Sequence, residues 1–280
     1  MVVDGCRDGS LDLLERLASQ DSRLVPVWQE NAGEGRARQA GAEVATGDVI
    51  VLLDDDVVAE AGLVSGHLAY HDGDRRRIVV GYMPTHLPVR RAPGQAASFL
   101  YSHDYESVCA LYESSSSEIL RSLWAGNMSL RRETALAMGL AGNSALGYHQ
   151  DREFGFRCLR AGLEPIFDRQ LRSSHSHLRS TVDFAAECHR QGAARVDLAR
   201  EYPDLVALEE VHGVSKVISR VCSLIARLRL GTVAAAVLLR VCGITGRMHW
   251  WHAETFVARV LRQVELSRGI LERSKVLSES

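Results

Sequence analysis

The sequence of 280 residues has no cysteine cluster and no long uninterrupted apolar run. Its six cysteines are scattered without a C-x-x-C pair, which argues against a disulfide framework or a zinc knuckle and favours a reducing compartment. The longest apolar stretch, Leu230 to Ile244, is interrupted by Arg240 and is too short to span a bilayer comfortably. The chain also opens without a basic-then-apolar leader. We therefore expect a cytoplasmic protein with no signal peptide and no transmembrane helix.

An excess of charge of one sign is lacking as well. The 33 Lys and Arg residues nearly balance the 35 Asp and Glu residues, which leaves a net charge of −2. Both signs are interspersed, so the composition gives no reason to expect bulk attraction to nucleic acid. The apolar fraction of 46% and the charged fraction of 24% are ordinary for a globular protein. A chain of this length can bury one large core or two smaller coupled ones.

Strand and helix patterns alternate along the first two thirds of the chain. Residues 49–53 form a continuous apolar run, which is typical of a strand buried on both faces. A helix rich in Ala and Arg precedes it over 32–45 and stops at Thr46-Gly47. This alternation predicts an α/β fold with a mainly parallel sheet flanked by helices. The other expected strands cover 1–3, 24–28, 78–82, 124–130 and 164–167, and the other expected helices cover 11–18, 57–70, 131–138, 150–161, 181–202 and most of 214–274.

Three consecutive acids, Asp54, Asp55 and Asp56, follow the apolar run at 49–53. Carboxylates crowded at the carboxyl end of a buried strand repel one another and lose hydration unless a cation lies among them. Open α/β sheets bind ligands at this edge, and Asp54 and Asp56 point to the same side if the strand persists. The alternative is a polar turn in which Asp56 caps the next helix.

Two other segments bring polar residues to the same edge of the sheet. Asp4 and Asp8 flank a glycine-containing turn directly after the first strand. The segment 31–33 opens a helix that carries Arg36 and Arg38, and the N-terminus of a helix attracts anions. Taken singly, each feature also has an ordinary explanation, because an Asp-Gly turn is usually only a turn and helix arginines usually face solvent.

The order and spacing of these segments resemble the family 2 type of GT-A glycosyltransferases. The family pattern V-V-D-G-S-x-D-G-S/T corresponds to VVDGCRDGS at 2–10, and N-x-G-x-x-x-A-R-N-x-G corresponds to NAGEGRARQAG at 31–41. The family's glycine and apolar strand ending in D-x-D correspond to GDVIVLLDDD at 47–56, and the departures are Cys6 and Gln39. The resemblance implies a nucleotide-sugar site formed by Asp4, Asp8, Arg38, Asp54 and Asp55, with Asp54 and Asp56 as ligands of Mn²⁺ or Mg²⁺.

The resemblance continues in two segments downstream. WAGNMSLRR at 124–132 is similar to the family's G-x-N-x-S-x-R-R segment, which implies that Gly126 and Asn127 lie on the acceptor side. GYHQDREFGFR at 147–157 is similar to its E-D-x-E-x-G-x-R helix, with Gln150 in place of the first acid. This match implies that Asp151 is the general base of an inverting transfer and that Glu153 also lies on the acceptor side. The alternative is that both acids only favour the first turn of a helix through its dipole.

A histidine pair follows the strand expected at 164–167. His175 matches the position of a further metal ligand of the family better than His177 does, and neutral imidazole can complete a carboxylate site for Mn²⁺. We therefore expect His175 to be the third ligand.

The resemblance also implies a division of the chain. Residues 1–85 correspond to the nucleotide-sugar-binding half and residues 86–205 to the acceptor-binding, catalytic half. A change to a purely helical pattern between Pro203 and Gly213 predicts a helical C-terminal extension over 206–280. The family's opening strand and its P-x-Y/F-N loop have no counterpart here. To account for this, we expect that the start of the chain is assigned downstream of the true start. The alternative is a non-catalytic homologue that binds or scaffolds.

A rival enzymatic interpretation starts from the same acids. Residues 49–58 also fit the apolar strand and D-x-D-x-V of haloacid-dehalogenase-like phosphatases, in which Asp54 is a nucleophile and Asp56 an acid or base. That interpretation fits poorly, because a complete strand–helix unit precedes the acids and Lys216 lies in the helical tail. We favour metal-dependent, inverting sugar transfer from a nucleoside-diphosphate sugar, with a UDP-sugar preferred. The acceptor is a glycan, a lipid-linked compound or a small molecule.

The helical tail alternates apolar residues with arginines and continues into Trp250-Trp251. A basic amphipathic helix with an aromatic pair can lie in a membrane interface, on the inner face near lipid-linked acceptors. The alternative is a helical subdomain that packs its apolar stripe on the core or on a second subunit. We favour packing, because Leu, Val and Ala dominate without a lysine-rich face. The arginines are Arg220, Arg227, Arg229, Arg240 and Arg247.

Overall fold

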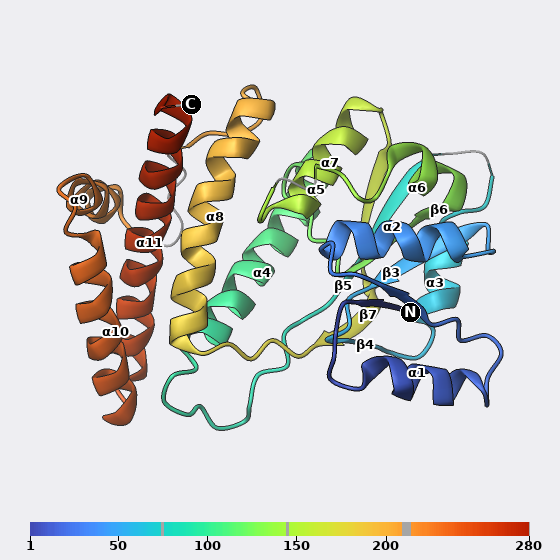
Figure 1. Cartoon of the computed structure of the whole chain (residues 1–280), viewed down its shortest axis with the longest axis horizontal. Coiled ribbons are helices and arrows are strands. Elements are labelled where there is room, and N and C mark those ends of the chain that lie inside the picture. Colours follow the sequence, from blue (N-terminus) through green and yellow to red (C-terminus); the bar gives the residue numbers. More distant parts are fainter. Residues whose placement is uncertain (74–75, 144–145, 209–213, 280) are drawn as a thin grey trace. The chain divides into compact units, whose positions relative to one another are not determined.

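Contacts within the computed structural model divide the protein into two compact units. The structure describes residues 1–73, 76–143, 146–208 and 214–279 (Figure 1). The first unit comprises Met1–Met83, Tyr112–Ala145 and Gln150–Ser173, and the second comprises Pro84–Leu111, Leu146–His149 and Ser174–Ser280.

The first unit is built on a five-stranded sheet with the strand order β3-β6-β5-β7-β4 (Figure 1). β6 (Asn127–Arg131) is antiparallel to both β3 (Val49–Leu53) and β5 (Arg77–Tyr82), whereas β7 (Glu164–His175) is parallel to β5. β3, β5 and β7 therefore run in the same direction, with β6 reversed among them. The expected α/β sheet flanked by helices is confirmed, as a mixed sheet. The helices of this unit include α5 (Ser117–Arg121), α6 (Arg132–Met138) and α7 (Gln150–Arg160).

A separate parallel pair joins β1 (Val2–Asp4) to β2 (Val27–Gln29). α1 (Ser10–Ala18) connects the two strands, and α2 (Glu34–Val44) follows β2 and packs on β1. This arrangement brings the turn after β1 next to the N-terminal end of α2.

A buried polar network ties β6 to its neighbours. His67 places Nδ1 2.8 Å from the hydroxyl of Ser129 and Nε2 2.9 Å from the amide oxygen of Asn127. His71 Nε2 lies 2.8 Å from the same Ser129 hydroxyl, and the Asn127 amide donates to the backbone oxygen of Leu171 at 3.0 Å. Because His67, Asn127 and Ser129 have no exposed surface, these bonds satisfy polar groups that water does not reach.

We expect this network to make the protein less stable in mild acid. Burial lowers the pKa of His71 from 6.5 to about 4, and the positive charges of His67 and Arg131 act in the same direction. Between about pH 6.5 and about pH 4, His71 is therefore protonated in the unfolded chain but stays neutral in the folded chain. The free energy of unfolding falls as the pH drops through this range. The loss is on the order of 2–3 kcal/mol. Urea unfolding at both pH values checks this for wild type, for His71→Gln and for the exposed-site control His103→Gln. An equal loss of unfolding free energy in wild type and in His71→Gln would contradict the prediction.

Residues 57–70, expected as one helix, form two elements. β4 (Val57–Ala59) extends the sheet, because the N–H of Glu60 donates to the backbone oxygen of Arg172 at 3.1 Å. α3 (Leu63–Ala69) begins only after Gly62, whose φ of 85° suits glycine. Asp56 therefore does not cap a helix, and that alternative is wrong.

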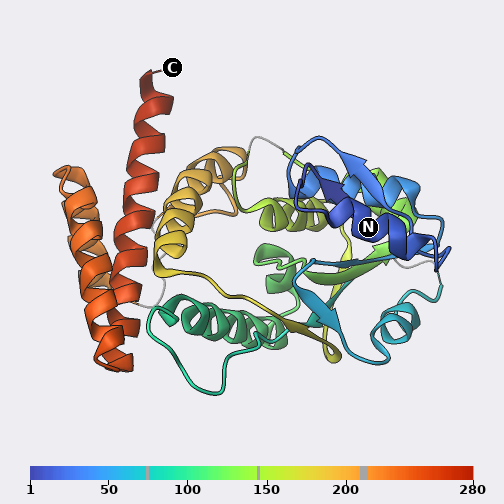
Figure 2. The same ribbon diagram turned by 60° about the horizontal axis from the view of Figure 1, so that its bottom comes forward.

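The second unit contains long helices packed side by side. The backbones of α8 (Thr181–Glu201) and α11 (Trp251–Glu279) approach closely, since a Cβ added to Gly192 would lie 2.2 Å from the backbone oxygen of Leu266. Figure 2 shows α11 with the preceding helices alongside it. Among the described residues, no helix has the length and apolar character needed to cross a membrane. The three-part functional division expected from the sequence stays a prediction. The other helices are α4 (Ala96–Ser114), α9 (Lys216–Arg227) and α10 (Gly231–Arg247).

Candidate functional site

Asp54, the first of the three consecutive acids, lies directly at the end of β3. Its N–H donates to the backbone oxygen of Gly126 at 3.2 Å. A Cβ on Gly126 would lie 2.6 Å from Oδ2 of Asp54 and 2.8 Å from Sδ of Met83. Because Gly126 has no side chain, there is room for the Asp54 carboxylate beside it.

Arg38 of α2 joins three carboxylates. Its Nη1 donates to Oδ1 of Asp151 at 2.6 Å, its Nη2 donates to Oδ1 of Asp54 at 2.8 Å, and Glu34 is a third ion-pair partner. Only 14% of the Arg38 side chain is exposed. Burial disfavours its charge, yet the three carboxylates outweigh that effect and raise the pKa of Arg38 above its ordinary value. Arg38 is thus a fixed cation that holds the end of β3 and the start of α7 together.

One arginine does not balance the acids gathered here. Loss of hydration raises the pKa of Glu34 to about 7, and although Arg38 opposes this shift, the charges of Asp151, Asp54 and Asp55 add to it. Four carboxylates, those of Glu34, Asp54, Asp55 and Asp151, lie around the single guanidinium of Arg38, which leaves a local excess of negative charge. Such an excess favours binding of a further cation at this edge.

Two donors orient the carboxylate of Asp151. Besides the bond from Arg38, its Oδ2 accepts a hydrogen bond from the N–H of Ala125 at 2.9 Å. The neighbouring Gln150 accepts from the N–H of Gly35, in the first turn of α2, at 3.1 Å. Although Asp151 does lie in the first turn of α7, its contacts are with α2 and with the segment before β6. It is therefore held by tertiary contacts as well as favoured by the helix dipole.

Asp4 occupies the N–H groups that were expected to face an anion. Its Oδ1 accepts from the side chain of Gln29 at 2.7 Å and from the N–H of Ala32 at 2.8 Å, and its Oδ2 accepts from the N–H of Gly33 at 2.8 Å. Burial raises the pKa of Asp4, but these hydrogen bonds outweigh it and lower the pKa overall. In this structure Asp4 fixes the loop before α2.

Asp8 and Asp55 are the remaining residues expected at the nucleotide sugar. Asp8 accepts from the N–H of Ser10 at 3.1 Å and from its hydroxyl at 2.6 Å, bonds that lower the pKa of Asp8 and cap α1. Asp55 is exposed in the turn between β3 and β4. The structure thus puts Asp8 in a capping role and leaves Asp55 open to solvent beside the cluster around Arg38.

Two residues expected on the acceptor side are buried. Asn127 has no exposed surface, and its amide is engaged by His67 and Leu171. Glu153 is 2% exposed and pairs with Arg157, whose Nε lies 2.7 Å from Oε1. The acceptor-side assignment of both residues stays a prediction, because the structure shows only that their side chains are almost fully buried and paired within the protein. Asn127 and Glu153 hold the scaffold of the site.

The histidines after β7 are arranged by an aromatic neighbour. His175, the last residue of β7, is nearly buried, and its N–H donates to the backbone oxygen of Pro84 at 3.1 Å. The ring of Tyr101, on α4, stacks on His177 with centroids 3.7 Å apart and meets His175 edge-on at 5.3 Å. The two imidazole centroids lie 5.3 Å apart.

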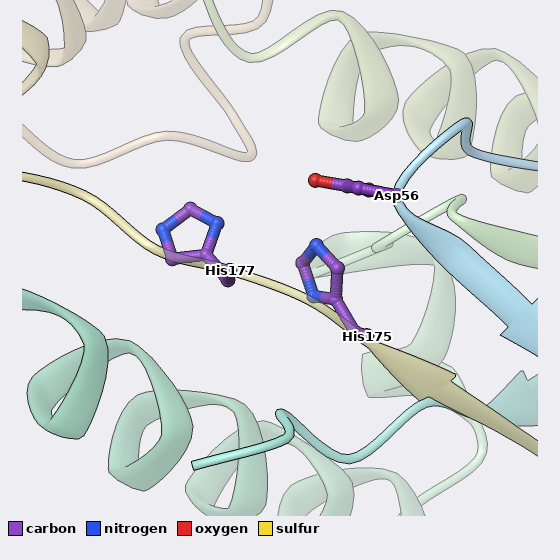
Figure 3. A group of neighbouring side chains, drawn as sticks. All are labelled: Asp56, His175 and His177. Carbon is purple, nitrogen blue, oxygen red and sulfur yellow. The ribbon is translucent and has the colours of Figure 1, made fainter. Parts of the chain in front are cut away.

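Asp56, His175 and His177 form a group suited to a metal ion (Figure 3). Each offers one ligand atom, and these atoms all lie within 4.8 Å of one another. One carboxylate and two imidazoles form a ligand set that Mn²⁺ and similar divalent metals accept, whereas Mg²⁺ prefers oxygen ligands alone. The expected ligands Asp56 and His175 are thus brought together, while Asp54 is engaged by Arg38.

Sequence reasoning missed three residues of this region. His177 was set aside in favour of His175, although the H-S-H spacing places both on one short segment. Glu34 stands one turn before Arg38, a spacing that favours an ion pair on a helix. Tyr101 lies in a region of the sequence with few clear signals, and no pattern connected it with the histidines.

The N-terminal part of the chain matches a known family. The family model described as Glycosyl transferase family 2 matches residues 1–132. The uncharacterized glycosyltransferase alr2836 of Nostoc sp. is 41% identical over 59 residues, which are 21% of this chain and 18% of that protein. The uncharacterized glycosyltransferase YfnE of Bacillus subtilis is 28% identical over 78 residues, which are 28% of this chain and 20% of that protein. The match spans about a fifth of the length of these relatives, and the resemblance to family 2 glycosyltransferases is confirmed.

A solved structure is similar over nearly the whole chain. The mannosyltransferase PcManGT from Pyrobaculum calidifontis, in complex with GDP-Man and Mn²⁺, gives a TM-score of 0.59. The similarity covers 95% of this chain and 76% of that one, at 14% sequence identity. At this identity the likeness concerns the fold, and the expected GT-A fold is confirmed.

Proposed function

From this likeness and the cluster around Arg38, we propose that the protein is a glycosyltransferase that moves a sugar from a nucleoside-diphosphate sugar to an acceptor hydroxyl. One observation carries the proposal. A single guanidinium, that of Arg38, holds Asp54 at the end of β3 and Asp151 at the start of α7. The acid that follows β3 and the expected base therefore lie at one site, on the edge of the sheet where open α/β folds bind ligands.

The reaction assigned to this site is a single displacement with inversion. As the acceptor oxygen attacks the anomeric carbon, Asp151 takes the proton of the acceptor hydroxyl. The bond between that carbon and the diphosphate oxygen breaks, and the nucleoside diphosphate leaves with the electron pair. The bonds from Arg38 and Ala125 fix the direction of the Asp151 carboxylate, so the base is aimed before the acceptor binds.

The donor is assigned to the residues around Asp54. Asp54 and Asp55 would contact the sugar and the ribose, and Arg38 would hold both Asp54 and the base. Asp4 would act at the nucleotide through the loop 31–33 that it fixes. The family resemblance favours a UDP-sugar. GDP- and dTDP-sugars remain in the test because the structural relative was solved with GDP-Man.

We assign Asp56, His175 and His177 as the residues that hold Mn²⁺ or Mg²⁺, with Mn²⁺ preferred on the chemistry of the ligands. When bound, the cation would offset the charge that collects on the departing diphosphate. Asp54, which the sequence suggested as a ligand, is assigned to the donor instead, because its carboxylate pairs with Arg38.

A donor-hydrolysis screen tests the proposal. UDP-, GDP- and dTDP-sugars are incubated with the protein and Mn²⁺, and release of nucleoside diphosphate is measured. We expect slow release from one nucleotide class, with the first-formed sugar anomer inverted by proton NMR. Release with retention would remove the single-displacement mechanism. Neither release nor binding with any donor would favour the non-catalytic alternative.

We expect Gly126→Ala to weaken donor binding without unfolding the protein. The new Cβ would push against the Asp54 carboxylate and the sulfur of Met83, both far ends of side chains that can move. The stability cost is therefore no more than about 1–2 kcal/mol, whereas donor affinity falls on the order of tenfold as Asp54 is displaced. Calorimetric titration with the donor checks this, and Gly243→Ala, at a site with open space, is the control. Unchanged donor affinity in Gly126→Ala would remove Asp54 from the donor site.

A further inference from the structure

The solvent-facing side of α9 is apolar. Val217, Val221, Leu224 and Leu228 recur at helical spacing, which places them in one stripe along the helix. All four are exposed, while the other side of the helix contributes Cys222 to the core. A surface helix of a globular protein ordinarily turns its apolar stripe inward and its polar face outward. α9 has apolar residues on both sides.

α10 repeats this arrangement. Its exposed apolar residues are also spaced by three or four, which again gives one stripe along the whole helix. Across both helices these side chains are 36% to 68% exposed, and their spacing makes them continuous stripes rather than the scattered single apolar residues that are ordinary on a protein surface. Trp250, just after α10, is exposed as well. The α10 stripe consists of Val233, Val237, Val241, Ile244 and Met248.

A groove joins the two stripes into one surface. It has a volume of about 400 Å³, and Val217 and Val221 of α9 and Val237 of α10 line it from their respective helices. Every lining side chain is aliphatic apart from Cys222. We call this surface, made of the two stripes and the groove, the apolar face.

The charged side chains of α9, α10 and the turn between them, within residues 214–253, are all basic. Lys216, Arg220 and Arg227 follow one another along α9 beside its stripe, and Arg240 and Arg247 do so on α10. These side chains are all exposed, as is Arg229 in the turn between the helices. Over residues 214–253 the sequence contains no Asp or Glu, although the whole chain is slightly acidic. The charge of the apolar face is therefore local and of one sign.

We infer that the apolar face docks on a lipid surface that carries negative charge, with α9 and α10 lying in the plane of the interface. Interfacial helices combine a buried apolar stripe with Lys and Arg at its borders, where the cations meet anionic headgroups. Exposed Trp residues prefer the same depth. This inference concerns the second unit alone and does not depend on the proposed transferase activity.

A second copy of the chain fits the apolar face less well. A symmetric dimer would bring the same patch of both subunits together. The basic residues along the borders would then meet an identical set, with no acidic residue in 214–253 to pair with them. Like charges opposed across an interface weaken association. An anionic lipid surface satisfies both the apolar stripes and the charge.

Vesicle co-sedimentation of the full chain tests the inference. Vesicles of phosphatidylcholine alone are compared with vesicles of equal parts phosphatidylcholine and phosphatidylglycerol. We expect binding to the anionic vesicles only, weakened by high salt. The triple variant Arg220→Gln, Arg240→Gln, Arg247→Gln should lower the partition coefficient on the order of 100-fold, since each cation near an anionic surface gives roughly a fivefold gain. The matched control removes three exposed arginines elsewhere, by Arg7→Gln, Arg16→Gln and Arg200→Gln.

A second variant tests the apolar part. Leu224→Ser with Ile244→Ser should reduce vesicle binding, while Leu13→Ser with Leu17→Ser, an exposed pair on α1, should not. Circular dichroism establishes that each variant is folded. Absence of binding to anionic vesicles, or equal binding by the triple variant and its control, would overturn the inference. A dimer in analytical ultracentrifugation that Leu224→Ser with Ile244→Ser dissociates would instead identify a second copy as the occupant.

Discussion

Replacing Asp151 by Asn is expected to lower kcat by about 10²- to 10⁴-fold, the usual contribution of a general base. The amide oxygen of Asn can still accept from Ala125 or from Arg38, so the start of α7 should keep its position. It cannot take up the proton of the acceptor hydroxyl. Donor affinity should therefore change little, and the loss should appear in kcat, measured by release of nucleoside diphosphate in the presence of acceptor or water.

The control for this variant is Asp183→Asn, because Asp183 also lies in the first turn of a helix, α8, but outside the cluster around Arg38. If Asp151 only favoured its helix through the dipole, both variants would lose a little stability and neither would lose turnover. Turnover of Asp151→Asn within a few fold of wild type would show that another group is the base.

The second large effect is expected for the metal. His175→Ala and Asp56→Ala should each weaken Mn²⁺ binding by more than about 100-fold, since losing a direct ligand costs more than the 10- to 100-fold loss found when only a supporting residue is removed. Electron paramagnetic resonance of free Mn²⁺ measures this without any assay of turnover. The control is His103→Ala, an exposed histidine near Asp104.

Asp54→Asn separates two interpretations of the acid triplet. If Asp54 serves the donor and Arg38, as we propose, Mn²⁺ affinity should stay within a few fold of wild type while donor affinity falls. If Asp54 is a direct ligand, as the D-x-D resemblance implies, Asp54→Asn should lose Mn²⁺ as fully as Asp56→Ala does. Mn²⁺ binding that survives both His175→Ala and Asp56→Ala would exclude the group in Figure 3 as the metal site.

Much of the fold can be predicted from local patterns in the sequence. The apolar run 49–53 forms β3 with the predicted bounds, because five apolar residues lie between turn signals. The expectation that this strand is buried on both faces is wrong, because β3 is the terminal strand of the sheet and only Ile50 is buried. The prediction of one helix over 57–70 is wrong because Val57–Ala59 forms β4 beside β7, a neighbour distant in sequence whose pairing overrides local helical spacing. The reversed direction of β6 depends on the topology of the whole sheet, which no local pattern reports.

The motifs identified the region of the site more reliably than the role of each residue. A motif marks which residues are needed, but it does not distinguish a side chain that meets a ligand from one that holds the scaffold. Asn127 and Glu153 lie in matching motifs and turned out to be buried, each with polar partners that only the folded chain brings near. The hydrogen bonds from Arg38 to Asp54 and to Asp151 could likewise not be predicted from the sequence, since the three residues come from separate segments.

The most direct test of the proposed function is a calorimetric titration of UDP- and GDP-sugars into the protein, in Mn²⁺ and again in excess EDTA. A metal-dependent donor site predicts saturable binding of one donor in Mn²⁺, weakened by at least about tenfold in EDTA. Asp21→Asn, at an exposed surface acid, should behave as wild type. Equal donor affinity with and without the metal would contradict the metal-dependent site, and so would the absence of donor binding under both conditions.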